Sequence, residues 1–139
     1  MPRLPGLTLN DADWLVRAAL DVGIDRGFPP LAVAVIDVAG EVVVLRRGDG
    51  GMPMTSRVAV AKARSALRAL KPSGLLDKMP PGIIDTLQHL YGGDFVHRAG
   101  GVLVTDGDDV ILGAIGASGA QSDEDEEAVR TAVERWQAR

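Results

Sequence analysis

The segment Leu31–Val38, LAVAVIDV, constrains the fold more than any other stretch of the chain. It is almost continuously apolar and rich in valine, which is typical of a strand that is buried on both faces. Ala39-Gly40 predicts a turn, and Glu41–Leu45 then returns as a second strand. Because this connection is too short to hold a crossover helix, the two strands must be antiparallel. We therefore expect an antiparallel sheet with a strand that helices cover.

Two stretches with helical periodicity flank this strand pair. Thr8 lies three residues before Asp11, the spacing of a capping box, and predicts the start of a helix that ends near Gly27. A glycine-rich loop, residues 46–53, follows the second strand. After it, Thr55–Leu70 is expected to form a second helix, because its apolar residues recur at helical spacing.

The second half of the chain repeats the order of strand pair and helix. Gly101–Thr105 and Val110–Ala117 predict two strands joined at the turn sequence DGDD. The weak pattern at Ile83–Tyr91 indicates a further helix, and the last helix is expected from Ser122 to about Arg135. The predicted fold class is α+β, with a single antiparallel sheet flanked by helices in one domain, residues 1–139.

The stretch Gly113–Glu127, GAIGASGAQSDEDEE, changes abruptly from small and apolar to acidic. Its glycines recur every third residue, no lysine follows, and the acidic run would repel an anion, so a phosphate loop is disfavoured. The glycines indicate either close packing of a strand or a backbone held near a ligand, and both alternatives remain open. We interpret the acidic run as a solvated helix start, with Asp125 at the capping-box position.

Composition excludes several functional classes. The chain has 139 residues, a formal net charge of -4 and no cysteine. A mildly acidic chain is a poor candidate for broad nucleic-acid binding, which depends on neutralising phosphates. Without cysteine there are no disulfides and no thiolate metal sites. No apolar run is long enough to span a membrane and the first ten residues lack the apolar core of a signal peptide, so a cytoplasmic protein is expected.

A series of short motifs occurs in the same order as in a known family. These motifs are Ala34-Val35-Ile36-Asp37, Gly40, Arg47-Gly48-Asp49-Gly50, Ala61-Lys62-Ala63, Gly100-Gly101-Val102, Gly113-Ala114-Ile115-Gly116-Ala117-Ser118-Gly119 and Asp125-Glu126. In these motifs the chain resembles the GlcG/HbpS-like haem-binding family, which includes the C-terminal domain of the adenosyltransferase PduO. The resemblance covers nearly the whole chain except residues 72–96.

This resemblance implies a profilin-like domain that assembles into a symmetric homo-oligomer, and binding of haem, a corrinoid or another tetrapyrrole. The sequence departs from the family pattern at Leu103, where the family has proline, and in its first predicted helix, which lacks a histidine. Haem iron takes His, Met, Cys or Tyr as an axial ligand. The candidates in this chain are His89, His97, Tyr91 and four methionines.

Three charged residues are candidate ligand-binding residues. Arg47 and Asp49 lie in the glycine-rich loop, where Arg47 can hold a carboxylate with its two-pronged guanidinium. The simpler interpretation of both is a loop ion pair or a turn carboxylate. Lys62 lies in an alanine-rich stretch of the second helix. It is either a surface lysine or an inward-pointing anion anchor or base.

The remaining candidates lie near the second strand pair. His97 precedes the Gly100-Gly101 bend and is a candidate acid/base group or ligand, although a solitary histidine is more often a surface residue. Ser118 does not have the spacing of a nucleophile elbow, so we interpret it as a ligand hydrogen bonder or a strand-end cap. Two histidines and scattered carboxylates give no metal-binding signature.

These observations predict a small-molecule-binding protein whose ligand is haem, another tetrapyrrole or a small organic acid. The pocket is expected to bring together the Arg47 loop, Lys62 and the Gly100-Gly101 bend. A catabolic lyase, isomerase or hydratase with Lys62 or His97 as general acid/base is the alternative. A purely structural oligomeric subunit is a third interpretation.

Overall fold

Strand β1 (Ala32–Ile36) lies inside a four-stranded antiparallel sheet with the order β2-β1-β4-β3. The computed structural model describes residues 1–2 and 6–139. All five residues of β1 are buried, which confirms the prediction of a strand covered on both faces. The other strands are β2 (Val42–Arg47), β3 (Gly101–Thr105) and β4 (Ile111–Ser118).

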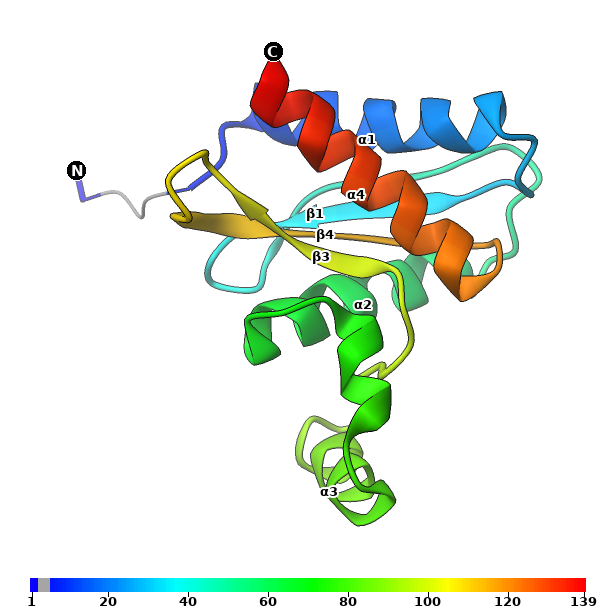
Figure 1. Cartoon of the computed structure of the whole chain (residues 1–139), viewed down its shortest axis with the longest axis vertical. Helices are drawn as coiled ribbons and strands as arrows, with labels where there is room; N and C mark the ends of the chain where they lie inside the picture. Colours follow the sequence, from blue (N-terminus) through cyan, green and yellow to red (C-terminus); the bar gives the residue numbers. More distant parts are fainter. Residues whose placement is uncertain (3–5) are drawn as a thin grey trace.

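Helices cover both faces of the sheet (Figure 1). Helices α1 (Leu9–Asp25) and α4 (Ser122–Ala138) lie on one face, and α2 (Thr55–Ala69) lies on the other. Because successive side chains of a strand point to opposite faces, Val33 and Val35 enter the core under α1 and α4. Ala32 packs instead against α2. The predicted α+β class with a flanked antiparallel sheet is therefore confirmed.

Small residues let α2 approach the sheet closely. A Cβ on Gly116 of β4 would overlap the carbonyl oxygen of Ala59, and one on Gly101 of β3 would overlap the carbonyl oxygen of Lys62. Both carbonyls belong to α2, so the helix backbone rests almost directly on the strand backbones. Close packing therefore explains Gly116 in the glycine-rich strand, one of the two alternatives that the sequence left open.

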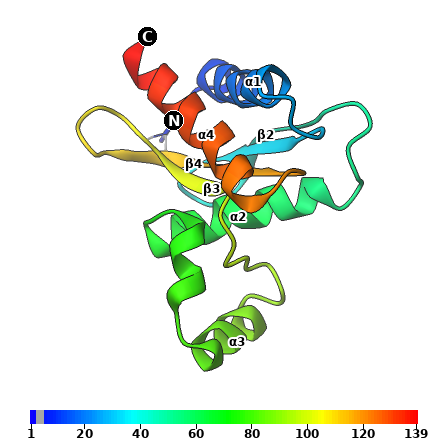
Figure 2. The ribbon, with the colours of Figure 1, turned by 45° about the vertical axis from the view of Figure 1, so that its right-hand side comes forward.

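Residues 73–96 project from the α2 side of the molecule (Figures 1 and 2). They contain the short 3-10 helix η1 (Ser73–Lys78) and helix α3 (Pro81–Leu90). A small apolar cluster of their own holds them together, formed by Leu76, Ile84 and Phe95. The projection therefore has a small apolar interior, and Ser73 ties it to β3 by accepting a hydrogen bond of 2.9 Å from the Gly101 N–H.

The start of α4 differs from the prediction. The helix is capped by Gln121, which forms a capping box with Glu124, one residue earlier than expected. This shift moves Asp125 from the cap to the inward face of the helix, where it is buried. The interpretation of the whole acidic run as a solvated helix start is therefore wrong at Asp125. The predicted cap at Thr8 is confirmed, since its side chain accepts a hydrogen bond from the Asp11 N–H.

Candidate functional site

Lys62 is buried at the contact between α2 and the sheet. Its Nζ lies 2.8 Å from Oδ2 of Asp125, and the two side chains are only 5% and 2% exposed. Of the two alternatives that the sequence left open, the inward-pointing lysine is therefore the one observed. Its ammonium group donates a hydrogen bond to the Asp125 carboxylate across this distance.

Asp125 joins three elements of the fold. Its Oδ2 accepts the bond from Lys62 of α2, and its Oδ1 accepts a hydrogen bond of 3.0 Å from the Ala120 N–H, just beyond β4. Burial raises the pKa of the Asp125 carboxyl above its ordinary value, because the loss of hydration outweighs the bonds from Lys62 and Ala120. Asp125 thus fixes the Lys62 ammonium at the N-terminal end of α4.

Gly100 makes room for the Lys62 side chain. It has a φ of 134°, a conformation that favours glycine, and a Cβ there would lie 2.7 Å from Cδ and 2.8 Å from Nζ of Lys62. The Ala117 N–H donates a hydrogen bond of 2.8 Å to the Gly100 carbonyl and holds the bend against β4. The structure thus packs Lys62 against the Gly100-Gly101 bend, although neither glycine lines the cavity described next.

A cavity of about 290 Å³ opens above the Lys62–Asp125 pair, and we call it the Lys62 cavity. It lies between the N-terminal ends of α2 and α4, the end of β4 and the segment before β3. Ser118, at the end of β4, contributes to its wall. The full set of lining residues is Met52, Met54, Thr55, Val58, Lys62, Val96, Arg98, Ser118, Gly119, Ala120, Ser122 and Asp125.

The mouth of the cavity carries a second cation and two thioethers. Arg98 has a side chain that is 64% exposed, and its Nη1 lies 3.8 Å from Oδ2 of Asp77. Met52 and Met54 are exposed large apolar residues at the end of the glycine-rich loop. The Lys62 cavity therefore combines a buried cation, an exposed cation and soft sulfur donors, a set suited to a carboxylate-bearing ligand.

Two of the sequence candidates lie outside this cavity. Arg47 is exposed on β2 and is not among the cavity-lining residues; its Nη1 lies 3.4 Å from the carbonyl oxygen of Pro53. Asp49 lines a separate cavity of about 410 Å³ near the end of α1. The structure therefore does not bring Arg47 or Asp49 to Lys62. Met52, from the same glycine-rich loop, does line the cavity.

His97 is also not among the residues that line the Lys62 cavity, although its neighbours Val96 and Arg98 are. Its Nδ1 lies 2.8 Å from Oδ1 of Asp77 in η1. His97 and Lys62 therefore do not converge on one cavity.

Sequence analysis missed Asp125 as a site residue, although a signal was present. Asp125 precedes Ala128 and Val129 by three and four residues, so it continues the apolar stripe of α4. A carboxylate on an apolar stripe requires a buried partner. Met52 and Met54 are among the four methionines that the sequence offered as candidate haem ligands, but nothing in the sequence placed them or Arg98 near Lys62, because their loops meet only in the folded chain.

Two features are absent from residues 1–2 and 6–139. No helix there has the length and hydrophobicity needed to cross a membrane. No group of three or more His, Asp or Glu side chains there has an arrangement that could hold a metal ion.

Comparison with known proteins identifies the family. A model of the family described as haem-degrading protein HbpS-like matches residues 7–134. The chain belongs to the HbpS-like family. This confirms the family that the sequence motifs indicated. No curated protein matches the chain.

Solved structures of other proteins share the fold. HbpS has 30% sequence identity and a TM-score of 0.84, over 97% of this chain and 93% of that chain. A PduOC–heme complex has 26% identity and a TM-score of 0.82, over 93% and 94% of the two chains. Protein ORFY from Klebsiella pneumoniae has 20% identity and a TM-score of 0.88, over 100% and 96%, and supports the fold alone.

Proposed function

We propose that this HbpS-like protein binds a carboxylate-bearing small molecule in the Lys62 cavity, and that haem is this ligand. The observation that carries the proposal is a buried ammonium that opens onto a cavity and is fixed by Asp125. The Lys62 ammonium has three N–H donors and one hydrogen bond to Asp125, so donors remain for the carboxylate of a ligand. The PduOC–heme complex supports haem as a ligand of this fold.

The donor set of the Lys62 cavity fits haem. The thioethers of Met52 and Met54 are of a type that ligates haem iron, and both line the cavity. Lys62 and Arg98 supply the positive charge that the two haem carboxylates require. When bound, haem supplies an iron centre, while the protein residues orient the carboxylates and cover one edge of the ring.

A small organic acid is a second candidate ligand, and the size of the cavity favours it. The volume of about 290 Å³ lies just below the range of roughly 300–1,000 Å³ that is typical of small-molecule pockets. A ligand of a few carbon atoms would fit entirely inside, with its carboxylate toward Lys62. A tetrapyrrole would extend past the exposed Met52 and Met54, and the homo-oligomer that the family resemblance implies would supply a second subunit to cover it.

Binding is better supported than catalysis by Lys62 or His97. Lys62 already donates a hydrogen bond to Asp125, whereas His97 bonds Asp77 and is not among the residues that line the cavity, so the two candidate acid/base groups do not converge on one bound substrate. A catabolic lyase, isomerase or hydratase would need another base among the lining residues, and Asp125 is already bonded on both oxygens.

Hemin titration followed by absorbance tests the haem proposal. Wild-type protein should shift the Soret band of the added hemin. The double variant Met52→Leu/Met54→Leu should give a band that differs from the wild type in position or intensity. Met79→Leu is the matched control, since Met79 lies in the apolar cluster of the projection. An unshifted Soret band with the wild type would contradict haem binding.

Calorimetric titration with succinate tests the organic-acid candidate. We expect binding to the wild type that is weakened about tenfold in Arg98→Ala, because one charged hydrogen bond is lost. The matched control is Arg130→Ala, on the outer face of α4. If neither hemin nor succinate binds, the proposed function is wrong.

A further inference from the structure

A second and larger cavity lies beside the Lys62 cavity. It has a volume of about 670 Å³, and we call it the β2–α2 groove. Val58 and Val96 line both cavities and form the wall between them. The complete set of residues lining the groove is Val42, Leu45, Ser56, Arg57, Val58, Val60, Ala61, Arg64, Gly92, Gly93, Asp94 and Val96.

One wall of the groove is an exposed apolar edge. Val42 and Leu45 belong to β2, the outermost strand of the sheet, and are 42% and 40% exposed. Val60 of α2 faces them across the groove. This wall and the volume suit an apolar molecule of the size that binds in typical ligand pockets.

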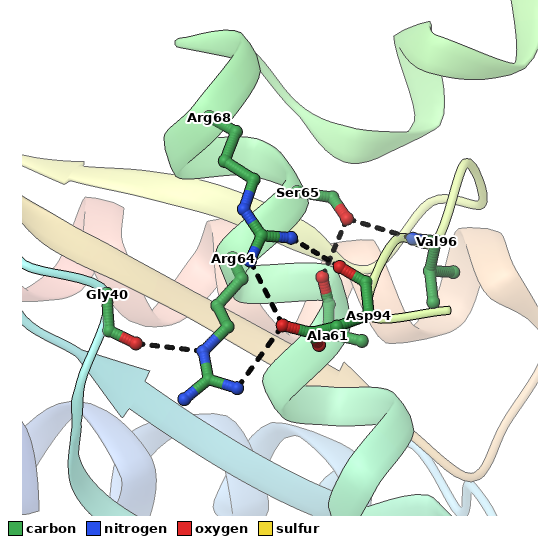
Figure 3. A network of polar contacts seen from close by, with 7 residues as sticks. All are labelled: Gly40, Ala61, Arg64, Ser65, Arg68, Asp94 and Val96. Atoms are coloured by element: carbon green, nitrogen blue, oxygen red, sulfur yellow. Dashed lines mark hydrogen bonds and ion pairs between the residues drawn. The ribbon is translucent and has the colours of Figure 1, made fainter. Parts of the chain in front are cut away.

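Arg64 is a preorganised cation in the groove. Its Nε donates a 2.8 Å hydrogen bond to the Gly40 carbonyl, and its Nη1 lies 3.3 Å from Oδ2 of Asp94 (Figure 3). A guanidinium has five N–H donors in a fixed fork, so donors remain for a ligand. A side chain already held in place loses little entropy when a ligand binds.

Asp94 does not neutralise this cation, because it is shared. Its Oδ2 also lies 3.0 Å from Nη2 of Arg68, and its carbonyl oxygen accepts a further bond from Arg68 (Figure 3). Arg68 in turn stacks on the Tyr91 ring, with 4.0 Å between its guanidinium carbon and the ring centroid. Two guanidinium groups on one carboxylate leave a net positive charge beside the groove.

Arg57 adds a second cation on the same helix. It lies seven residues before Arg64, which is about two helical turns, so both side chains lie along one face of α2. Both line the groove. No ion pair of Arg57 is found in the part of the chain that the structure describes. The carboxylate of Glu41 lines a separate cavity, to which Arg64 and Asp94 also contribute.

We propose that the β2–α2 groove binds an apolar molecule that carries a carboxylate, with the apolar body on Val42, Leu45 and Val60. The carboxylate lies between Arg57 and Arg64. None of the lining residues is His, Met, Cys or Tyr, so the groove offers no axial ligand for haem and is a site of its own. This inference goes beyond the function proposed for the Lys62 cavity.

Fluorescence titration with 1-pyrenebutyrate tests the groove, and 1-pyrenebutanol serves as the uncharged probe with the same apolar body. The wild type should bind the butyrate at least tenfold more tightly than the alcohol. Arg57→Ala should remove most of this difference, because it deletes an exposed cation and no internal contact. Arg98→Ala, which alters the mouth of the Lys62 cavity, should leave both affinities unchanged.

Each other outcome overturns the inference. Equal affinities for the two probes, or an Arg57→Ala variant that keeps the full preference, would show that the arginines do not recognise a carboxylate. Loss of binding in Arg98→Ala but not in Arg57→Ala would place the probe in the Lys62 cavity. Absence of binding by a stable oligomer would show that a second copy covers the groove.

Discussion

At the scale of single residues, the Lys62–Asp125 pair is the most consequential contact in the molecule. Burying two charges is costly, and their mutual attraction repays that cost only with good geometry and further hydrogen bonds. Here the distance is 2.8 Å and the second Asp125 oxygen is bonded to the Ala120 N–H. The pair therefore links α2, β4 and α4 while it presents a cation to the cavity.

Replacing Lys62 by Met should destabilise the protein strongly. The variant leaves the Asp125 carboxylate buried without a cation, which costs about 3–5 kcal/mol of unfolding free energy. The double variant Lys62→Met/Asp125→Leu should recover most of that loss, since no buried charge remains. Urea denaturation followed by circular dichroism measures both; equal stabilities of the single variant and the wild type would contradict a buried pair.

The difference in unfolding free energy between the wild type and Lys62→Met should become smaller as the pH is lowered. Burial raises the pKa of Asp125, so the folded state holds the proton more tightly than the unfolded state. The stabilisation that this bound proton provides is complete at a pH below the pKa of Asp125 in the unfolded state. It is lost as the pH rises through the pKa of Asp125 in the folded state. In the variant, protonation also removes the uncompensated charge, so the deficit should shrink as the pH falls from 7 toward about 4. A deficit that does not change with pH would exclude Asp125 as its source.

At the scale of elements, the contact between α2 and the sheet depends on residues without side chains. Gly101 and Gly116 place strand backbone directly under α2. Glycine-rich spacing in the sequence indicated close packing only as one of two alternatives. It did not identify α2 as the partner, because the position of α2 depends on contacts across the whole fold. The strands themselves were predictable, since their apolar patterns and turns are local.

Gly116→Ala should lower the free energy of unfolding by about 1–3 kcal/mol or more, because its methyl group would overlap the Ala59 carbonyl. The matched control is Gly107→Ala in the β3–β4 turn, where a Cβ would meet no atom within 4 Å. Thermal denaturation measures the loss of stability in each variant. Equal losses in Gly116→Ala and Gly107→Ala would contradict the close packing of α2 on β4.

At the scale of the whole molecule, a three-layer body carries a projection, residues 73–96, on its α2 side (Figure 2). The projection is tied back through Asp94, which binds Arg64 and Arg68. Sequence analysis found this region hardest to interpret, because these partners lie about 30 residues apart. The family could be inferred from motif order along the chain, whereas the cavities depend on how the loops meet.

Asp94→Ala should loosen the projection without affecting the sheet. The variant removes the carboxylate that holds two arginines, so hydrogen exchange of residues 73–96 should accelerate while that of β1 and β4 stays slow. Hydrogen-exchange mass spectrometry measures both regions at once. Uniform acceleration across the chain would show that Asp94 stabilises the whole body instead.

The most direct test of ligand binding next to the Lys62–Asp125 pair is the NMR signal of the Lys62 ammonium in protein with ¹⁵N-labelled lysine. A buried, ion-paired ammonium exchanges its protons slowly and should give a resolved signal, unlike the exposed Lys71 and Lys78. Addition of succinate should shift the Lys62 signal in a saturable manner and leave the other two unchanged. A Lys62 signal that stays in place at saturating succinate and with sub-stoichiometric hemin would contradict the assignment of this cavity as the binding site.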